Sequence, residues 1–167
     1  MSKSEDQGRR GKIEAKMVRL LARKKKTLAL AESCTGGFIA HQITNVPGAS
    51  KVFLGGIVAY SNGVKEKFLG VRPETLKKHG AVSEAVAREM AIVARKKFGA
   101  DFAVAVTGIA GPAGGTKDKP VGTVFISVAG AFGTLAERKL NSFGREKFKE
   151  TTAQQALEML RARLVSA

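Results

Sequence analysis

Ser33 and Lys65 are the residues of this sequence whose types could together carry out nucleophilic catalysis. A serine hydroxyl is a weak nucleophile unless a base accepts its proton, and neither His41 nor His79 is suitably placed to do so. A lysine can act as that base when burial or a neighbouring cation lowers its pKa and leaves the amine neutral. Tyr60 could assist by donating a hydrogen bond to an oxyanion or by passing on a proton.

Each of these side chains also has a common structural role. Ser33 could cap a helix, although Thr35 is an equally good cap and neither is followed three positions later by Glu or Gln. Serine caps are common and catalytic serines are rare, so local chemistry alone favours the cap. Lys65 could be a solvated lysine at a helix start, and Tyr60 could cover the sheet. Cys34 is a rival nucleophile, but no histidine is ready to form its thiolate, and small buried cysteines are common.

The stretch 28–37, LALAESCTGG, is expected to position Ser33. A short apolar run ends in a polar cluster, and two glycines then open a pattern of apolar residues at helical spacing. This order predicts a strand, a tight turn and a helix N-terminus. Such a junction holds Ser33 at the carboxyl end of a strand, beside unpaired helix N–H groups that favour negative charge. A developing oxyanion would find hydrogen-bond donors there.

Predicted strands and helices alternate along the rest of the chain. Apolar periodicity predicts a helix capped by Ser83 and further helices over 12–24, 36–45, 64–69, 73–80 and from about 145. Apolar runs predict strands over 27–31, 52–60, 102–106, 121–129 and, at an edge, 134–141. Gly55 and Gly56 interrupt the second strand and indicate a bulge or a close backbone approach. This order predicts an α/β fold, a single three-layer α/β/α domain with a mixed, mostly parallel sheet.

Three predicted strand ends are rich in polar and glycine residues, namely 32–37, 60–65 and 107–116. Sites gather where strands end in loops in folds of this class. The glycine-rich loop 107–116 lacks the Gly-Lys-Ser/Thr of a P-loop and the dinucleotide-binding fingerprint. Its glycines could simply permit turns, or its exposed amides could cradle a phosphate.

Composition narrows the class of protein. The length of 167 residues favours one domain, with residues 1–10 as a polar tail and 11–167 as the folded part. No apolar stretch approaches the roughly 20 residues that cross a bilayer, and the run at 17–22 is too short for a signal peptide. We therefore expect no membrane partner. One cysteine excludes an internal disulfide and fits a cytoplasmic location, and the histidines lack the spacing of zinc ligands.

The formal net charge of +15 raises the hypothesis of a polyanion partner. Residues 1–26 hold ten Lys or Arg but three Asp or Glu, so nearly half of the excess lies in this leading segment. Such a segment is usually a solvated tail or helix face. The chain has no Trp, one Tyr and no evident nucleic-acid-binding pattern, which argues against nucleic acid. An anionic small molecule would be equally well attracted.

Five segments, in order, carry a resemblance to a known family: AESCTGG at 31–37, GGIVAYSNGVK at 55–65, GAVS at 80–83, TGIAGPAGG at 107–115 and KPVGT at 119–123. They closely resemble the CinA C-terminal domain family, whose stand-alone members are nicotinamide-nucleotide amidohydrolases, also called PncC or NMN deamidases. The resemblance runs from about residue 17 to residue 165.

The resemblance implies hydrolysis of nicotinamide mononucleotide (NMN) to nicotinate mononucleotide and ammonia, within pyridine-nucleotide salvage. By motif, Ser33 would be the nucleophile, Lys65 its base, and Tyr60 and Thr107 assisting hydroxyls. The residues implied in substrate binding are Thr35, Gly36, Gly37, Gly108, Gly111, Gly114, Gly115 and Arg145. The family implies no metal or other cofactor, a nucleotide as the small-molecule partner, and a homodimer or higher homo-oligomer. The cationic pyridinium ring would activate the carboxamide and help to keep Lys65 neutral.

The chain departs from the family pattern near its C-terminus. The family's Phe-x-Gly-x-Arg with a second Arg four residues later is replaced here by Phe143-Gly144-Arg145 and Lys149. The loop is shorter, and an ammonium cannot hold phosphate through two parallel hydrogen bonds. A catalytically weak nucleotide-binding or partner module of the same fold is therefore a second hypothesis. The nucleotide pyrophosphatase domain of fused members is not expected here.

Overall fold

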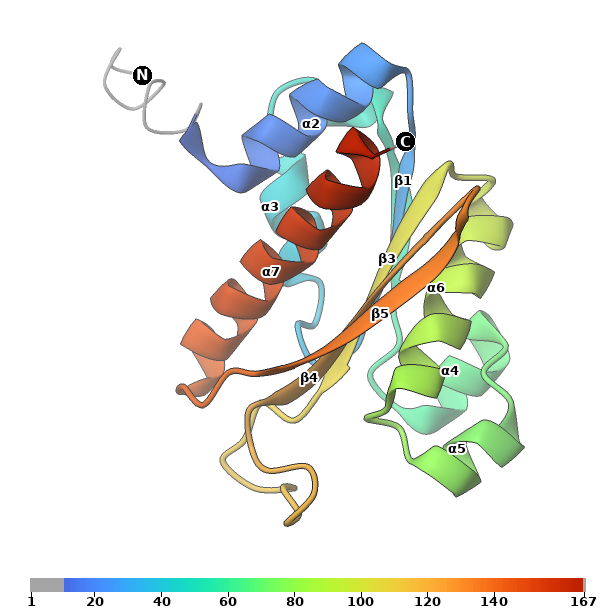
Figure 1. Cartoon of the computed structure of the whole chain (residues 1–167), viewed down its shortest axis with the longest axis vertical. Helices are drawn as coiled ribbons and strands as arrows, with labels where there is room; N and C mark the ends of the chain where they lie inside the picture. Colours follow the sequence, from blue (N-terminus) through green and yellow to red (C-terminus); the bar gives the residue numbers. More distant parts are fainter. Residues whose placement is uncertain (1–10, 167) are drawn as a thin grey trace.

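The computed structural model describes residues 11–166, and the polar tail predicted at 1–10 lies outside the described residues. Within residues 11–166, a five-stranded sheet forms the middle layer, and helices pack on both of its faces (Figure 1). The chain thus has the α/β fold and the three layers that the sequence predicts.

The helices divide between the two faces of the sheet. One face is covered by α2 (Ile13–Lys24), α3 (Phe38–Thr44) and α7 (Arg145–Val165). The other is covered by α4 (Asn62–Leu69), α5 (Pro73–His79) and α6 (Glu84–Phe98), while a short 3-10 turn, η1 (Ala49–Lys51), precedes the second strand.

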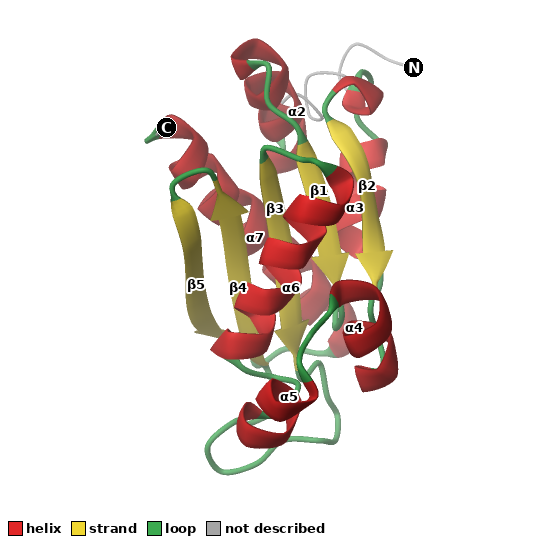
Figure 2. Ribbon diagram, turned by 90° about the vertical axis from the view of Figure 1, so that its right-hand side faces the viewer, coloured by secondary structure: helices red, strands yellow, loops and turns green. Residues whose placement is uncertain are grey.

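The sheet has the strand order β2-β1-β3-β4-β5. Its strands are β1 (Leu28–Glu32), β2 (Phe53–Val58), β3 (Phe102–Gly108), β4 (Thr123–Gly130) and β5 (Gly133–Leu140). β1 pairs in parallel with β2 and β3, whereas β4 pairs antiparallel with β3 and β5, so the sheet is mixed and β4 alone runs against the other four described strands. The carboxyl ends of β1, β2 and β3 meet at one edge, beside α4 and α5 (Figure 2).

Side-chain alternation along β1 divides the interior into two cores. Leu28 and Leu30 join a core of large aliphatic residues under α2, α3 and α7. Ala29 and Ala31 join the second core, under α6. All four side chains are buried. The small residues on the α6 side let this helix pack close to the centre of the sheet.

β2 contains both features that its two glycines indicate. Leu54 is an extra residue, because Phe53 and Gly55 pair with consecutive residues of β1. A Cβ atom on Gly55 would lie 2.7 Å from the ring of Phe98 in α6. Glycine at this position therefore lets the bulged strand lie directly against that helix.

Several element ends differ by one or two residues from their predicted positions, and two of these differences lie next to the site. α3 begins at Phe38 rather than at residue 36, because Gly36 and Gly37 have φ angles of 61° and 92°, which a right-handed helix does not use. β3 continues to Gly108, two residues beyond its predicted end. Ser83 caps α6 as predicted, since its hydroxyl accepts a hydrogen bond from a backbone N–H in the first turn. β5 is the edge strand, also as predicted.

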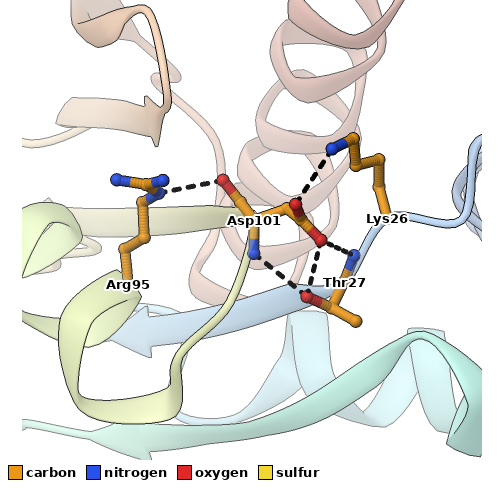
Figure 3. Close-up of polar contacts among 4 residues, drawn as sticks. All are labelled: Lys26, Thr27, Arg95 and Asp101. Carbon is orange, nitrogen blue, oxygen red and sulfur yellow. Dashed lines mark hydrogen bonds and ion pairs between the residues drawn. The ribbon is translucent and has the colours of Figure 1, made fainter.

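Asp101 ties the starts of β1 and β3 together at the opposite end of the sheet (Figure 3). Its carboxylate accepts hydrogen bonds from Lys26 Nζ at 3.0 Å, the Thr27 backbone N–H at 2.9 Å and the Thr27 hydroxyl at 3.0 Å. Its carbonyl accepts a further bond from Arg95 Nε at 2.9 Å. Burial raises the pKa of the Asp101 carboxyl, but the hydrogen bonds from Lys26 and Thr27 outweigh it and hold that pKa below its usual value. The cluster fixes two strands whose far ends form the site described next.

Candidate active site

The predicted nucleophile and base are in direct contact. Ser33 is the first residue after β1, and Lys65 lies in the first turn of α4. The Ser33 Oγ and Lys65 Nζ atoms are 2.9 Å apart, although the residues are 32 positions apart in the chain. Ser33 is 7% exposed and Lys65 is 2% exposed. The two groups therefore meet in a site from which most water is excluded.

Local sequence explains why Lys65 points inward. Ser61 caps α4 by accepting a hydrogen bond from the Val64 N–H at 3.3 Å, so the helix begins one turn before the lysine. Lys65 and Leu69 are one turn apart and are both buried, whereas the residues between them are exposed. The buried face of this short helix thus carries a lysine where an apolar residue is usual.

Backbone carbonyl groups, rather than a carboxylate, hold the amine of Lys65. Nζ lies 2.9 Å from the carbonyl oxygen of Ala59 and 3.5 Å from that of Tyr60. Burial lowers the pKa of Lys65 below its usual value. A neutral amine has two N–H donors and one lone pair, so the donors can serve the two carbonyls while the lone pair faces the Ser33 hydroxyl. With the amine neutral, this geometry would allow the Ser33 proton to pass to Lys65.

Cys34 is adjacent to Ser33 and is buried to a similar extent, but its thiol is not activated. Burial raises the pKa of its thiol to about 12. Its Sγ packs in the aliphatic core, close enough to Gly108 that a Cβ there would lie 3.1 Å from the sulfur. Because the thiolate is the reactive form, this environment disfavours Cys34 as a nucleophile.

Glu32 is a site residue that sequence reasoning missed. Its side chain is 1% exposed, and its carboxylate accepts a hydrogen bond of 2.6 Å from the Thr35 hydroxyl. The carboxylate also accepts hydrogen bonds of 3.1, 3.1 and 2.8 Å from three backbone N–H groups at the start of α3, those of Gly37, Ile39 and Ala40. Glu32 therefore caps α3.

The sequence suggested Ser33 or Thr35 as the cap of α3, and both suggestions are wrong, because the cap is Glu32. Thr35 instead donates its hydroxyl proton to Glu32. The Ser33 hydroxyl is free to contact Lys65. Glu32 lies five to eight residues before the N–H groups that it serves, outside the spacing of a capping box. The sequence signal for this cap is an acidic residue that ends an otherwise apolar strand, shortly before two glycines and a helix.

A cleft of about 250 Å³ opens beside Ser33. Tyr60 and Arg145 form part of its wall, and both are exposed. Arg145 Nη1 donates to the Tyr60 hydroxyl at 3.3 Å, and its Nη2 donates to the carbonyl of Gly111 in the glycine-rich loop. Arg145 thereby joins the first turn of α7 to Tyr60 and to the glycine-rich loop, and its guanidinium group lies at the rim of the cleft.

The structure brings six of the predicted site residues to this cleft, namely Ser33, Tyr60, Gly108, Gly111, Gly114 and Arg145. Lys65 lies directly behind Ser33.

The other predicted site residues are placed around the cleft rather than in its wall. Thr107 is buried and donates its hydroxyl proton to the carbonyl of Ala81 at 2.8 Å. Gly115 packs on the neighbouring part of its own loop, where a Cβ would lie 2.6 Å from the Val121 nitrogen. Thr35 and Gly37 donate to Glu32, and Gly36 donates its N–H to the Ser33 carbonyl. The roles suggested for these residues stay predictions.

Lys149 lies one turn after Arg145 on α7. Its Nζ is 3.8 Å from the position that a Cβ on Gly36 would occupy and 6.0 Å from the centre of the Phe38 ring. A second cation thus stands over the β1–α3 turn. α7 therefore carries one positive charge in the wall of the cleft, on Arg145, and another over the turn that contains Ser33, on Lys149.

No group of three or more His, Cys, Asp or Glu side chains in residues 11–166 is arranged to hold a metal ion. Across the same residues, no helix has both the length and the apolar character needed to span a membrane.

Comparison with known protein families gives a match over most of the chain. The model of the CinA C-terminal domain matches residues 10–164. Two relatives described as CinA-like proteins are 61% identical over 117 residues (Thermotoga sp. strain RQ2) and 50% identical over 153 residues (Thermotoga neapolitana). These alignments cover 70% and 92% of this chain, but 29% and 37% of the relatives. The chain thus spans about a third of the length of these relatives.

Solved structures show the same fold. A competence/damage-inducible protein from Agrobacterium tumefaciens is 41% identical with a TM-score of 0.87, over 90% of this chain and 92% of that one. A CinA superfamily protein from Klebsiella pneumoniae is 32% identical with a TM-score of 0.89, over 93% of this chain and 97% of that one.

Proposed function

The chain belongs to the CinA C-terminal domain family, and from this membership and the site geometry we propose that it hydrolyses the carboxamide of NMN to nicotinate mononucleotide and ammonia. The observation that carries the proposal is the 2.9 Å contact between Ser33 Oγ and Lys65 Nζ beside an open cleft. A buried amine with a lowered pKa is a competent base for a serine hydroxyl.

Acylation is the first half of the proposed reaction. Ser33 Oγ attacks the carboxamide carbon while its proton passes to Lys65 Nζ, and the carbonyl electrons move onto oxygen to give a tetrahedral oxyanion. When the carbonyl re-forms, the C–N bond breaks and Lys65 returns the proton to the leaving nitrogen, which departs as ammonia. The products of this step are an ester on Ser33 and a neutral Lys65.

Deacylation reverses these roles with water. A water molecule attacks the ester carbon while Lys65 accepts one of its protons, and the second tetrahedral intermediate collapses with the proton returned to Ser33 Oγ. The acid product leaves as its carboxylate. The pyridinium charge of NMN helps both halves, because it withdraws electrons from the acyl carbon and disfavours a second positive charge on Lys65.

Tyr60 and Arg145 have complementary roles in the proposal. The Tyr60 oxygen accepts a hydrogen bond from Arg145, so the phenol proton is available to an oxyanion in the cleft. The phosphate of NMN would bind Arg145 and, more weakly, Lys149. The N–H groups that start α3 are expected to contribute little to phosphate binding, because Glu32 already occupies them.

Release of ammonia from NMN by the purified protein tests the proposal, with NAD as a second substrate. Ser33→Ala and Lys65→Met should each lower the rate at least about 10³-fold, by the loss of nucleophile or base. Ser50→Ala and Lys67→Met are matched controls, since Ser50 is exposed and distant in sequence and Lys67 is exposed on the same helix as Lys65. Full activity of Ser33→Ala would remove Ser33 from the proposed role.

A nucleotide-binding module with little turnover is the second candidate. Lys149 in place of an arginine favours it, because an ammonium contacts phosphate as a point charge and orients it less firmly. This function predicts that NMN raises the melting temperature without release of ammonia. Ammonia release that requires Ser33 would exclude it.

Two further expectations are open to simple tests. The homo-oligomer that the family implies would be seen by sedimentation velocity. A polyanion-binding role for residues 1–26 predicts steeply salt-dependent DNA or RNA affinity that is lost when this segment is deleted.

A further inference from the structure

A second hollow lies apart from the catalytic cleft, between the N-terminal end of α6 and the face of β4. This groove has a volume of about 460 Å³ and is lined in part by His79, Arg88, Lys119 and Phe125. None of its lining residues also lines the cleft beside Ser33. The groove belongs to the face of the molecule that Figure 2 shows, where α6 crosses in front of the sheet and α5 lies below it.

Neutral carbonyl groups, rather than carboxylates, position two cations here: Lys119, which lines the groove, and Arg138, which lies over the lining residue Phe125. Lys119 Nζ donates to the carbonyl of His79 at 2.7 Å, and Arg138 Nη2 donates to the backbone carbonyl of Asp118. Within residues 11–166, neither Lys119 nor Arg138 forms an ion pair with a carboxylate. Both cations are therefore held in place while their charges stay unneutralised, which favours an anionic ligand.

Arg88 differs from these two cations. It pairs with Glu84 at 2.8 Å and also donates to the carbonyl of Thr134. Glu84 also lines the groove and largely balances the charge of Arg88, so the positive excess comes from Lys119 in the lining and from Arg138 beside Phe125.

Phe125 supplies an apolar surface beside these charges. It faces Arg138 directly across the β4–β5 ladder, and the guanidinium carbon lies 5.9 Å from the centre of its ring. Phe125 is 8% exposed and is one of the residues that line the groove. The edge of an aromatic ring that lies under a guanidinium can contact a second flat ring. The guanidinium can then donate hydrogen bonds to an anionic group attached to that second ring.

We propose that this groove is a binding site for an aromatic anion, a molecule in which a phosphate or carboxylate group is attached to a flat apolar ring. Lys119 and Arg138 hold the anionic group, and the ring lies against Phe125. The volume is large enough for a ligand of this size. This binding proposal is independent of the catalytic function proposed above.

Phenyl phosphate is a probe that has both parts of the proposed ligand. Isothermal titration at low salt with the full chain should detect its binding, whereas inorganic phosphate and phenol, which each have one part, should bind at least about tenfold more weakly. The double variant Lys119→Met/Arg138→Met should weaken phenyl phosphate binding by about tenfold or more. The matched control is Lys117→Met/Lys139→Met, which removes the same charge from the same loop and strand at residues that neither line the groove nor lie over Phe125. The control should stay within about twofold of the wild type.

Arg145→Gln separates this site from the catalytic cleft, because it weakens any binding of phenyl phosphate in the cleft and should leave binding in the groove unchanged. Backbone amide shift changes in the wild-type protein should cluster at residues 79–88 and 119–125, a readout that needs no variant to fold. Four results would each overturn the proposal: no binding, equal weakening by both double variants, loss of binding in Arg145→Gln, or shift changes confined to the loop around Ser33.

Discussion

Substitution of Glu32 by glutamine tests whether a buried carboxylate holds the turn that presents Ser33. The change keeps the size of the side chain but replaces one carboxylate oxygen with an NH₂ group. Oε2 accepts three of the four hydrogen bonds, and Oε1 accepts the remaining one, from the N–H of Ala40. The amide oxygen is expected to take the Oε2 position, so the new NH₂ group opposes the N–H of Ala40.

The cost has two parts. Two donors that face each other leave the N–H of Ala40 without a partner, which costs about 1–3 kcal/mol in a buried site. The other three hydrogen bonds change from a charged to a neutral acceptor and become weaker, although a neutral amide is less costly to bury than a carboxylate. Together these effects should lower the free energy of unfolding by about 3 kcal/mol for Glu32→Gln, which is large for a near-isosteric change.

Urea unfolding followed by circular dichroism measures this difference, since the chain has no Trp to report by fluorescence. Glu66→Gln in α4 is the control, because this carboxylate is exposed and its loss should change stability by less than about 0.5 kcal/mol. Thr35→Val should be less costly in the Glu32→Gln background than in the wild type, since the two share a hydrogen bond. A Glu32→Gln protein within about 0.5 kcal/mol of wild-type stability would refute the assigned cap.

Three further predictions follow from the polar groups of the structure. Asp101→Asn should lower the free energy of unfolding by about 1–2 kcal/mol at pH 7. Because the folded pKa of Asp101 is lowered, the stability difference between wild type and Asp101→Asn should disappear as pH falls below 3.8 and through the folded pKa. A difference that does not change with pH would contradict stabilisation by the charged carboxylate. The pKa of Lys65 is lowered on folding, so the stability of the wild type should rise with pH between that folded pKa and 10.5. Lys65→Met should lack this rise. Parallel stability curves for the two proteins would argue against a buried titrating amine. Cys34 should resist iodoacetamide in the native protein at pH 8 and react in urea, because burial raises its pKa to about 12, and rapid native labelling would show an accessible thiolate.

The contact between Ser33 and Lys65 is of a kind that sequence patterns can anticipate. Ser33 follows one buried strand, and Lys65 follows a second apolar strand after a Ser-Asn-Gly turn. Parallel pairing of β1 and β2 brings their carboxyl ends to one edge, so the residues that follow them are neighbours in space. The same periodicities, together with Ser83 and the break at Gly55, set most of the element boundaries.

Other parts of the site depend on contacts that no local pattern encodes. Glu32 acts on N–H groups that reach it only after the chain has turned through two glycines in left-handed conformations. The direction of the Thr107 hydroxyl is set by the carbonyl of Ala81, 26 residues earlier in the chain. Sequence therefore identifies the residue types at the strand ends, whereas tertiary packing decides which of them face the cleft.

Titration of the Lys65 amine is the measurement that tests the central claim most directly. Nuclear magnetic resonance of lysines labelled at Cε follows this group, and Lys65→Met assigns its signal. The structure predicts a pKa below the usual 10.5, and an NMN deamidase activity that falls on the acid side of that same pKa as the amine gains its proton. A Lys65 pKa at or above 10.5 would contradict the account, because the amine would then be charged at neutral pH and unable to accept the proton of Ser33.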